Sequence, residues 1–214
     1  MEIRVEQDLF QTETALAEEN RRLFLEHRWT AVNLLAGPGS GKTSLIRQTA
    51  PLLDIPVAVI EGDPASRIDT DLLNSLGIPA FQINTEGGCH LEAPMIQKAL
   101  REFQPVAGSL LMIENVGNLI CTAAYPLGEA ARIVMLGVSE GDDKPFKYPQ
   151  IFQGADAVVL NKIDLQTFVD FDLDRFYQGL AALSPAIPVF EVSCKTGTGL
   201  REWADWLRGR CITP

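Results

Sequence analysis

The sequence lacks two features that would place the protein at a membrane or on a nucleic acid. No apolar run approaches the roughly 20 residues that a membrane-spanning helix needs, and residues 1–30 carry charges throughout instead of a signal-peptide core. Basic residues are in deficit, because 18 Lys and Arg face 28 Asp and Glu and the net charge is −10. We therefore expect a cytoplasmic protein with no nucleic-acid and no membrane partner, although this balance still allows one small basic pocket for a nucleotide.

Cysteine and histidine are scarce. The four cysteines stand at positions 89, 121, 194 and 211, too widely scattered to suggest a disulfide framework. The chain has two histidines, His27 and His90. Thiols in a reducing compartment stay free, so we expect free cysteines, some of them candidate metal ligands.

Short apolar runs alternate with helical stretches over most of the 214 residues. The runs are unbroken and rich in Val, Ile and Leu, which suits strands buried on both faces, and they span residues 31–36, 55–60, 80–84, 109–114, 131–139, 156–161 and 187–193. Helices are predicted between most of them, at residues 42–53, 67–76, 91–103, 165–182 and 199–209. This alternation predicts an α/β fold, a mostly parallel sheet with helices on both faces.

The N-terminal segment has a different pattern. Residues 5–27 are predicted to form an amphipathic helix, with apolar residues near one face: Val5, Leu9, Leu16, Leu23 and Phe24. The rest of the chain contains no internal repeat and no low-complexity linker. We therefore expect residues 1–29 to form an N-terminal helical extension and residues 30–214 to form one domain.

The stretch "GPGSGKTS", residues 37–44, matches the G-x-x-x-x-G-K-[ST] pattern of a phosphate-binding loop. It follows a predicted strand and opens a predicted helix, where backbone N–H groups and the helix N-terminus attract phosphate. Lys42 is expected to neutralise charge on the β- and γ-phosphates, and Thr43 to offer its hydroxyl to Mg²⁺. The candidate phosphate-binding residues are Gly37, Gly39, Ser40, Gly41, Lys42, Thr43 and Ser44.

A second motif indicates which nucleotide base the protein binds. "NKID", residues 161–164, ends the sixth apolar run, at the sheet edge where such folds bind ligands. The Asp164 carboxylate can accept two hydrogen bonds from guanine but not from adenine, which predicts GTP and GDP as ligands and a GTPase (G) domain over residues 30–214. Asn161 and Lys162 would support this loop, and "SCKTG", residues 193–197, would complete the pocket with Ser193, Cys194 and Lys195.

Acidic residues follow two other runs. Asp63 and Asp69, with Glu61, are expected in a loop after the second run that senses the γ-phosphate, and Glu114 ends the fourth run. The predicted magnesium set is Thr43, Asp63, Asp69 and Glu114, and the predicted catalytic set is Lys42, Asp63, Asp69 and Glu114. No glutamine or arginine is obviously placed to assist hydrolysis, so slow intrinsic GTP turnover is expected.

Cys89 and His90 are adjacent in "TEGGCHLEAP", and Cys121 follows the Glu114 run. Loops after parallel strands end on one edge of the sheet, so these three residues can meet there. Thiolate and imidazole suit Ni²⁺ or Zn²⁺ better than Mg²⁺. From spacing alone, metal binding and burial of ordinary core cysteines are equally supported, and His90 could instead cap the following helix.

Together these motifs resemble the HypB family, GTPases that help insert nickel into [NiFe]-hydrogenase. The resemblance rests on "GPGSGKTSL", "IEGDPASRID", "NTEGGCHLEAPMI", "IENVGNLIC", "SEGDDKPFKYP" and "NKIDL", in the family's order over roughly residues 30–210. It implies a P-loop NTPase fold of the SIMIBI-type G-domain class, a homodimer, and a nickel or zinc site at residues Cys89, His90 and Cys121. It also implies two partners, a HypA-like metallochaperone and the hydrogenase large subunit.

Some alternatives stay open. The urease accessory GTPases share the phosphate loop but carry Cys-Pro-His, whereas Cys89 and His90 are adjacent here. A P-loop small-molecule kinase would need an acceptor pocket and an arginine-rich lid. The N-terminus lacks the cysteine- or histidine-rich tract of many HypB proteins, so we expect no nickel storage and a helix that packs or docks a partner. In residues 139–149, Lys144 or Lys147 would contact a second subunit, or the loop is simply solvated.

Overall fold

The computed structural model describes residues 5–211, with side chains from residue 13 onward. Its centre is one sheet of seven parallel strands, in the order β3-β2-β4-β1-β5-β6-β7. The strands are β1 (Thr30–Ala36), β2 (Val57–Asp63), β3 (Ala80–Asn84), β4 (Leu110–Glu114), β5 (Ala131–Gly137), β6 (Ala157–Asn161) and β7 (Val189–Glu191). The predicted α/β fold is confirmed, and every loop that follows a strand leaves from the same edge.

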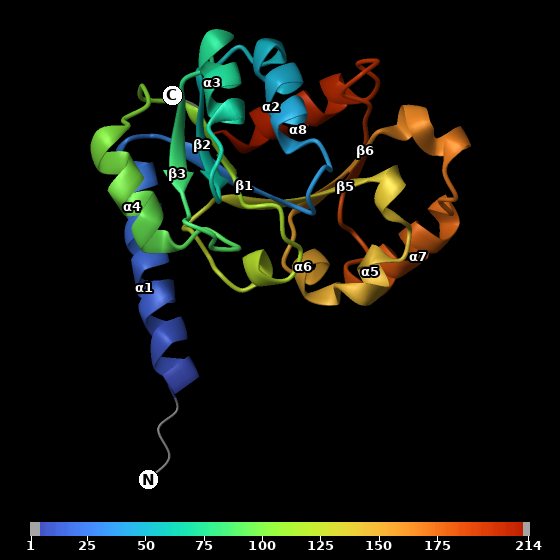
Figure 1. The fold of residues 1–214 in the computed structure, drawn as a ribbon, viewed down its shortest axis with the longest axis horizontal. Helices are drawn as coiled ribbons and strands as arrows, with labels where there is room; N and C mark the ends of the chain where they lie inside the picture. The colour runs from blue at the N-terminus through green and yellow to red at the C-terminus, as the bar shows by residue number, and fades with distance from the viewer. Residues whose placement is uncertain (1–4, 212–214) are drawn as a thin grey trace.

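Helices cover both faces of this sheet (Figure 1). One face carries α2 (Lys42–Thr49), α3 (Ile68–Ser75) and α8 (Leu200–Arg210). The opposite face carries α1 (Val5–Glu26), α4 (Ala93–Glu102), α6 (Pro149–Gln153) and α7 (Leu173–Leu183). Shorter elements complete the chain: α5 (Lys144–Lys147) and the 3₁₀ helices η1 (Ala50–Leu52), η2 (Cys121–Ala123), η3 (Val138–Glu140) and η4 (Ile163–Phe168).

The central strands are buried on both faces, as their unbroken apolar runs predict. In β1, Val32 and Leu34 pack against the α2–α8 side, whereas Ala31 and Leu35 pack against the opposite side. The Trp203 ring is fully buried under α2, and its indole N–H donates to Oγ1 of Thr49 over 3.1 Å. The buried, closely packed central strands fix the positions from which the functional loops start.

Three boundaries differ from the sequence prediction. The helix expected at residues 165–182 begins only at Leu173, because the Asp172 carboxylate accepts a hydrogen bond from the Arg175 N–H and caps α7 there. The segment before it forms η4 instead. β2 runs on through Asp63, where it is still paired with β3. Residues 139–149, where a loop was expected, contain the end of η3, the short helix α5 and the first residue of α6.

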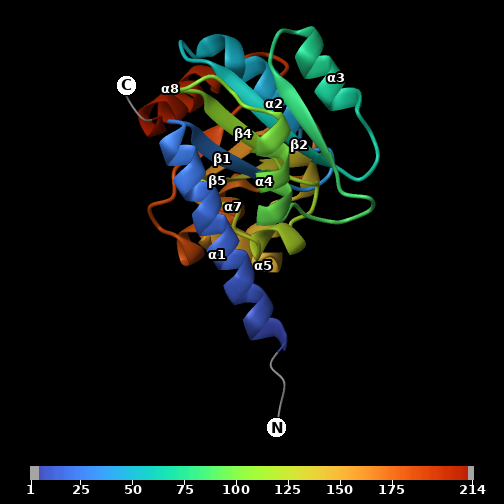
Figure 2. The same cartoon turned by 90° about the vertical axis from the view of Figure 1, so that its left-hand side faces the viewer.

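Helix α1 confirms the predicted N-terminal helix. It lies beside α4, and its N-terminal part projects away from the sheet (Figures 1 and 2). Phe24 of this helix is buried, whereas Val5 and Leu9, expected on the same face, lie outside the described side chains. Between residues 5 and 211, no helix is both long enough and apolar enough to span a membrane.

Candidate nucleotide and metal sites

The phosphate loop joins β1 to α2 and turns on two glycines. Gly39 has φ 76° and Gly41 has φ 100°, a region that residues with a Cβ avoid. A Cβ on Gly41 would also lie 2.7 Å from Nδ2 of Asn161, so the position excludes a side chain on steric grounds. No side chain caps this end of α2. Its first-turn N–H groups are therefore directed at the space that a phosphate would occupy.

The remaining residues of the motif line this turn. Ser40 is buried and its hydroxyl donates to the carbonyl of Gly37 over 3.0 Å. Lys42 is buried at the start of α2, and Ser44 is half-buried one residue beyond Thr43. The geometry brings all seven sequence-predicted phosphate-binding residues into one loop and one helical turn.

The loop after β6 is tied to the phosphate loop. Asn161 donates from Nδ2 to the carbonyl of Ser40 over 2.9 Å, and Nζ of Lys162 donates to the carbonyl of Gly39 over 2.6 Å. Lys162 itself has φ 63°, which turns the chain sharply into η4. These contacts place the predicted base-binding loop directly beside the predicted phosphate-binding loop.

The loop after β7 completes this arrangement. The Ser193 hydroxyl donates to Oδ1 of Asp164 over 2.6 Å, and the Cys194 N–H donates to Oδ1 of Asn161 over 3.2 Å. Lys195 is exposed at the rim. Burial raises the pKa of the Cys194 thiol to about 11, so the thiol is protonated at neutral pH.

Glu114 faces the phosphate loop from the end of β4. The Thr43 hydroxyl donates to Oε1 of Glu114 over 2.9 Å, while Oε2 is buried without a hydrogen-bond partner. Burial raises the pKa of Glu114 to about 7, although the nearby Lys42 ammonium acts in the opposite direction. A hydroxyl beside an unsatisfied buried carboxylate oxygen is a donor set that fits Mg²⁺.

The acidic residues after the second run do not form the single loop that was expected. Glu61 lies inside β2, fully covered, and accepts a hydrogen bond from the Thr70 hydroxyl. Asp63 ends β2, and its Oδ1 accepts from the N–H groups of Ala65 and Ser66. Asp69 lies in the first turn of α3. The strand continues through Glu61 and Asp63 because β3 pairs with it as far as Asp63, which a sequence pattern does not reveal.

Glu140 is a residue that sequence reasoning missed. Its Oε1 accepts the Gly137 N–H over 2.7 Å, and its Oε2 lies 2.6 Å from where a Cβ on Gly37 would be. Burial raises the pKa of this carboxyl group. Glu140 therefore packs the loop after β5 directly against the phosphate loop. Its place in "SEGDDKP" was visible in the sequence, but its contact with Gly37 requires the fold.

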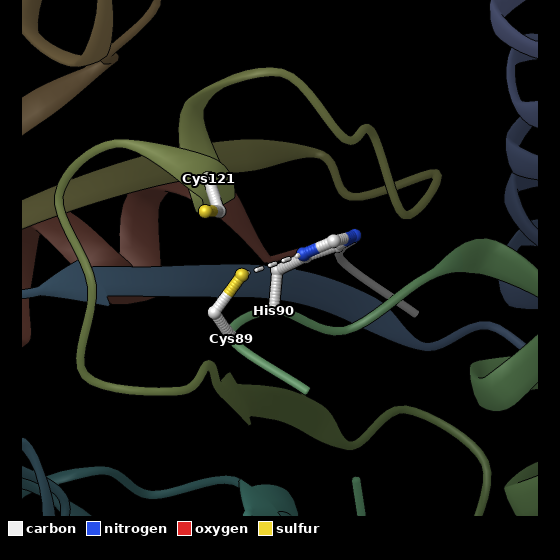
Figure 3. Close-up of side chains that lie close together, drawn as sticks. All are labelled: Cys89, His90 and Cys121. Carbon is white, nitrogen blue, oxygen red and sulfur yellow. Dashed lines mark hydrogen bonds between the residues drawn. The ribbon is translucent and has the colours of Figure 1, made fainter. Parts of the chain in front are cut away.

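The three candidate metal ligands come together from two loops (Figure 3). Cys89 and His90 lie between β3 and α4, and Cys121 opens η2 after β4. Their ligand atoms all lie within 4.8 Å of one another, and within the described residues they form the one such group of three or more His, Cys, Asp or Glu. The sulfur of Cys89 is 3.4 Å from Nδ1 of His90, and a hydrogen bond with Cys121 raises the pKa of Cys89.

The His90 ring is held on one face and at one edge. It stacks on Tyr125, with ring centroids 3.8 Å apart, and its Nε2 lies 3.4 Å from Oε1 of Glu92 without forming a hydrogen bond. The alternative of a helix cap is wrong, because Glu92 occupies the N-cap position of α4. Two thiols and one imidazole form a soft donor set that suits Ni²⁺ or Zn²⁺.

A buried hydrogen-bond chain begins next to Glu114. Oδ1 of Asn115 accepts the N–H of Leu91 over 3.0 Å, one residue beyond His90. Nδ2 of Asn115 donates to Oδ1 of Asn33 in β1 over 3.2 Å. Asn115 thus contacts both the strand that carries the phosphate loop and the segment that carries two of the candidate ligands.

The same chain continues to the Cys121 segment. Nδ2 of Asn33 donates to Oε1 of Glu129 over 3.1 Å, and Nε of Arg132 donates to the same oxygen over 2.7 Å. Arg132 also donates from Nη1 to the carbonyl of Ala123 over 3.0 Å, two residues beyond Cys121. Buried polar chains of this kind hold their members in a fixed arrangement when every donor is used.

The parallel sheet, the phosphate loop after β1 and the base loop after β6 define a P-loop nucleotide-binding protein with the base-recognition loop of GTP-binding members. The family described as CobW/HypB/UreG, nucleotide-binding domain, matches residues 31–191. The chain belongs to this family.

Individual relatives agree with this assignment. Over 207 residues the chain is 45% identical to the hydrogenase maturation factor HypB of Azotobacter vinelandii, covering 96% of this chain and 68% of that protein. The crystal structure of HypB from Helicobacter pylori in complex with nickel has a TM-score of 0.87 at 35% identity, covering 94% of this chain and 98% of that one. HypB from Archaeoglobus fulgidus also has a TM-score of 0.87, at 39% identity over 94% and 100% of the two chains.

Proposed function

We propose that the protein is a GTP-hydrolysing switch that binds nickel and promotes its insertion into the large subunit of [NiFe]-hydrogenase. The observation that carries the proposal is the cluster of Cys89, His90 and Cys121, one short segment away from Glu114 of the nucleotide site. The similarity to HypB proteins, one of them solved with nickel, supports nickel as the cargo. Zn²⁺ would fit the same donors.

The nucleotide chemistry follows from the residues around the phosphate loop. The N–H groups of the loop and Lys42 would hold the β- and γ-phosphates, and Asp164 would select guanine through its carboxylate. Mg²⁺, held through Thr43 and Glu114 with Asp63 and Asp69 nearby, would neutralise phosphate charge when bound. No arginine is placed by sequence to stabilise the transferred charge, so hydrolysis by the chain alone would be slow.

Coupling between the two sites has a physical route. The segment from Glu114 to Cys121 begins at the proposed magnesium position and ends at a candidate metal ligand. Asn115 joins the same segment to the Cys89–His90 loop through Leu91. Loss of the γ-phosphate would shift Glu114 and so change the ligand geometry, provided that nickel binds the two states with different affinity.

Three donors leave the coordination of a metal ion incomplete in one chain. A homodimer in which two such clusters face each other would complete it, and a HypA-like metallochaperone would exchange the metal with this surface. The N-terminal extension, residues 1–29, and the G domain, residues 30–214, form the proposed division of the chain.

Nickel binding and oligomer mass, measured together, test this function. The wild type and the Cys89→Ser/Cys121→Ser variant would be compared with GDP and with a non-hydrolysable GTP analogue. We expect nickel binding to be lost in the variant, and wild-type affinity to differ between the nucleotides. Phosphate release from GTP but not ATP, without an acceptor, separates this function from that of a kinase. Unchanged nickel binding in the variant would refute the proposed metal site.

A further inference from the structure

Asn20 is a buried polar residue that neither the nucleotide site nor the metal cluster accounts for. It lies on α1 with no exposed surface. Its side-chain amide donates both hydrogens from Nδ2, one to the carbonyl of Ala93 and one to the carbonyl of Leu127, each over 3.0 Å. Those acceptors stand 73 and 107 residues further along the chain. One amide group therefore joins three distant segments.

The two acceptors belong to the two segments that carry the metal ligands. Ala93 is the first residue of α4, three positions after His90. Leu127 follows Cys121 by six positions, and its N–H donates to Oε2 of Glu129 over 2.7 Å. The Leu127 peptide unit is thus held from both sides. Asn20 bridges these two segments from the N-terminal helix α1.

Backbone packing fixes α1 at this place. Gly128 has φ 91°, and a Cβ there would lie 2.3 Å from the carbonyl oxygen of Ala17 and 2.8 Å from the N atom of Arg21. No side chain fits between the helix and this loop. The backbone of α1 therefore rests directly on the segment that follows Cys121.

Helix α1 also contacts α4 at a further point. One residue before Asn20, Oε2 of Glu19 accepts a hydrogen bond from Nε2 of Gln97 over 3.0 Å. The helix thus spans the start of α4 as well as the Leu127–Gly128 loop.

Apolar packing alone gives no reason for an asparagine at position 20. Its Oδ1 is buried with no hydrogen-bond partner, which carries a desolvation cost that an apolar side chain would not have. The surroundings on this face are apolar, with Phe24, Leu127 and Ile96 in one cluster. What the asparagine supplies and an apolar residue cannot supply is the connection between the two carbonyls.

We propose that helix α1 helps to shape the metal site and that Asn20 on this helix positions the three candidate ligands. By holding Ala93 and Leu127 together, Asn20 keeps the thiols of Cys89 and Cys121 and the His90 ring within ligand distance of one another. The identity of the metal rests on the proposed function. The positioning of the two thiols does not, because it concerns the chain without metal.

The test uses Asn20→Leu, which keeps the side-chain size but removes both hydrogen bonds. The control is Phe24→Leu, which loosens the packing of α1 without touching either carbonyl.

Nickel affinity is measured by competition with a chromophoric chelator, together with the sulfur-to-nickel absorption bands, GDP affinity and thermal unfolding. We expect Asn20→Leu to weaken nickel binding by about 10- to 100-fold, the usual effect of removing a residue that orients metal ligands, and to shift the bands. GDP affinity should stay within about twofold, since the ties between the phosphate and base loops do not involve α1.

A metal-free measurement separates this inference from the proposed function. Phenylarsine oxide bridges two neighbouring thiols by forming two As–S bonds and releasing water, so its binding reports on the Cys89–Cys121 pair. We expect wild type and Phe24→Leu to capture it tightly and Asn20→Leu to lose at least about tenfold in affinity. If arsenical capture depends on Asn20 while wild type binds no nickel, the positioning role stands and the proposed cargo is wrong. Equal capture and equal nickel affinity in Asn20→Leu and wild type would overturn the inference.

Discussion

The Thr43 hydroxyl donates a 2.9 Å hydrogen bond to Oε1 of Glu114, and the second oxygen of that carboxylate is buried without a partner. The glutamate side chain therefore reaches from the end of β4 to the first turn of α2. The pair is the magnesium position that we propose, and it has an energetic cost, because an unsatisfied buried carboxylate destabilises the fold.

Glu114→Gln should therefore have opposite effects on stability and on hydrolysis. Without nucleotide and magnesium at pH 8, removing the buried charge should raise the free energy of unfolding, by up to about 3 kcal/mol given the raised pKa. Magnesium-dependent GTP hydrolysis should fall by about 10- to 100-fold because the amide is a poorer partner for the metal. Denaturant unfolding and a phosphate-release assay measure both. A variant that is less stable yet equally active would contradict this account of the site.

Asp164→Asn should change the preferred base. A carboxylate accepts from both the N1–H and the exocyclic amine of guanine, whereas an amide offers one acceptor and one donor. That pattern matches xanthine, which carries a carbonyl where guanine carries the amine. We expect GDP affinity to fall by about 100-fold or more and xanthosine diphosphate to become the better ligand, measured by calorimetry.

Ser193→Ala is the matched control for this base switch. It removes only the hydroxyl that donates to Asp164 over 2.6 Å and should weaken both nucleotides modestly, without reversing their order. If Asp164→Asn still prefers GDP, this residue does not recognise the base.

The order of strands and helices was predictable because each local signal agreed with the global fold. Unbroken apolar runs marked all seven strands, and glycines followed by Lys42 marked the phosphate loop. Boundaries were less predictable where a single side chain decides them. Asp172 caps α7 and so sets its first residue. The sequence did not reveal this cap, because the residues before and after Asp172 both have a helical pattern.

Contacts between loops could not be predicted in the same way. The chemistry of Cys89 and Cys121 suggested a metal, but their separation depends on how far β3 and β4 lie apart in the sheet, with β2 between them. Asn20 and Asn115 are polar residues inside otherwise apolar stretches, and nothing local indicates which distant carbonyl or amide each one binds. Such residues are assigned only when the fold supplies their partners.

The thiol of Cys194 should resist alkylation at neutral and mildly alkaline pH. Burial raises its pKa to about 11, so at pH 9 only a small fraction is thiolate, the reactive form. The rate of its alkylation by iodoacetamide, followed by peptide mass spectrometry, should rise about tenfold per pH unit up to pH 11. In denaturant the alkylation rate of the same cysteine should level off above about pH 8.5. Because folding favours the protonated thiol, stability is complete below the unfolded pKa and falls as pH rises towards 11. Equal rates in folded and unfolded protein at pH 8 would show that the Cys194 thiol is open to solvent.

Asn115→Leu should uncouple the two sites without removing either. The leucine keeps the volume but leaves the Leu91 N–H and Oδ1 of Asn33 without their shared partner, so Glu114 and the Cys89–His90 loop lose their buried link. Coupling free energy is reciprocal, so the ratio of nickel affinities with GDP and with a GTP analogue should move towards one, and nickel should alter nucleotide affinity less by the same factor.

Asn74→Ala is the control, because Asn74 also makes two hydrogen bonds, to Ala80 at the start of β3, far from this link. If the ratio stays as in wild type while both ligands bind normally, coupling passes through the Glu114–Cys121 segment alone. Asn115 would then serve only to fill the core.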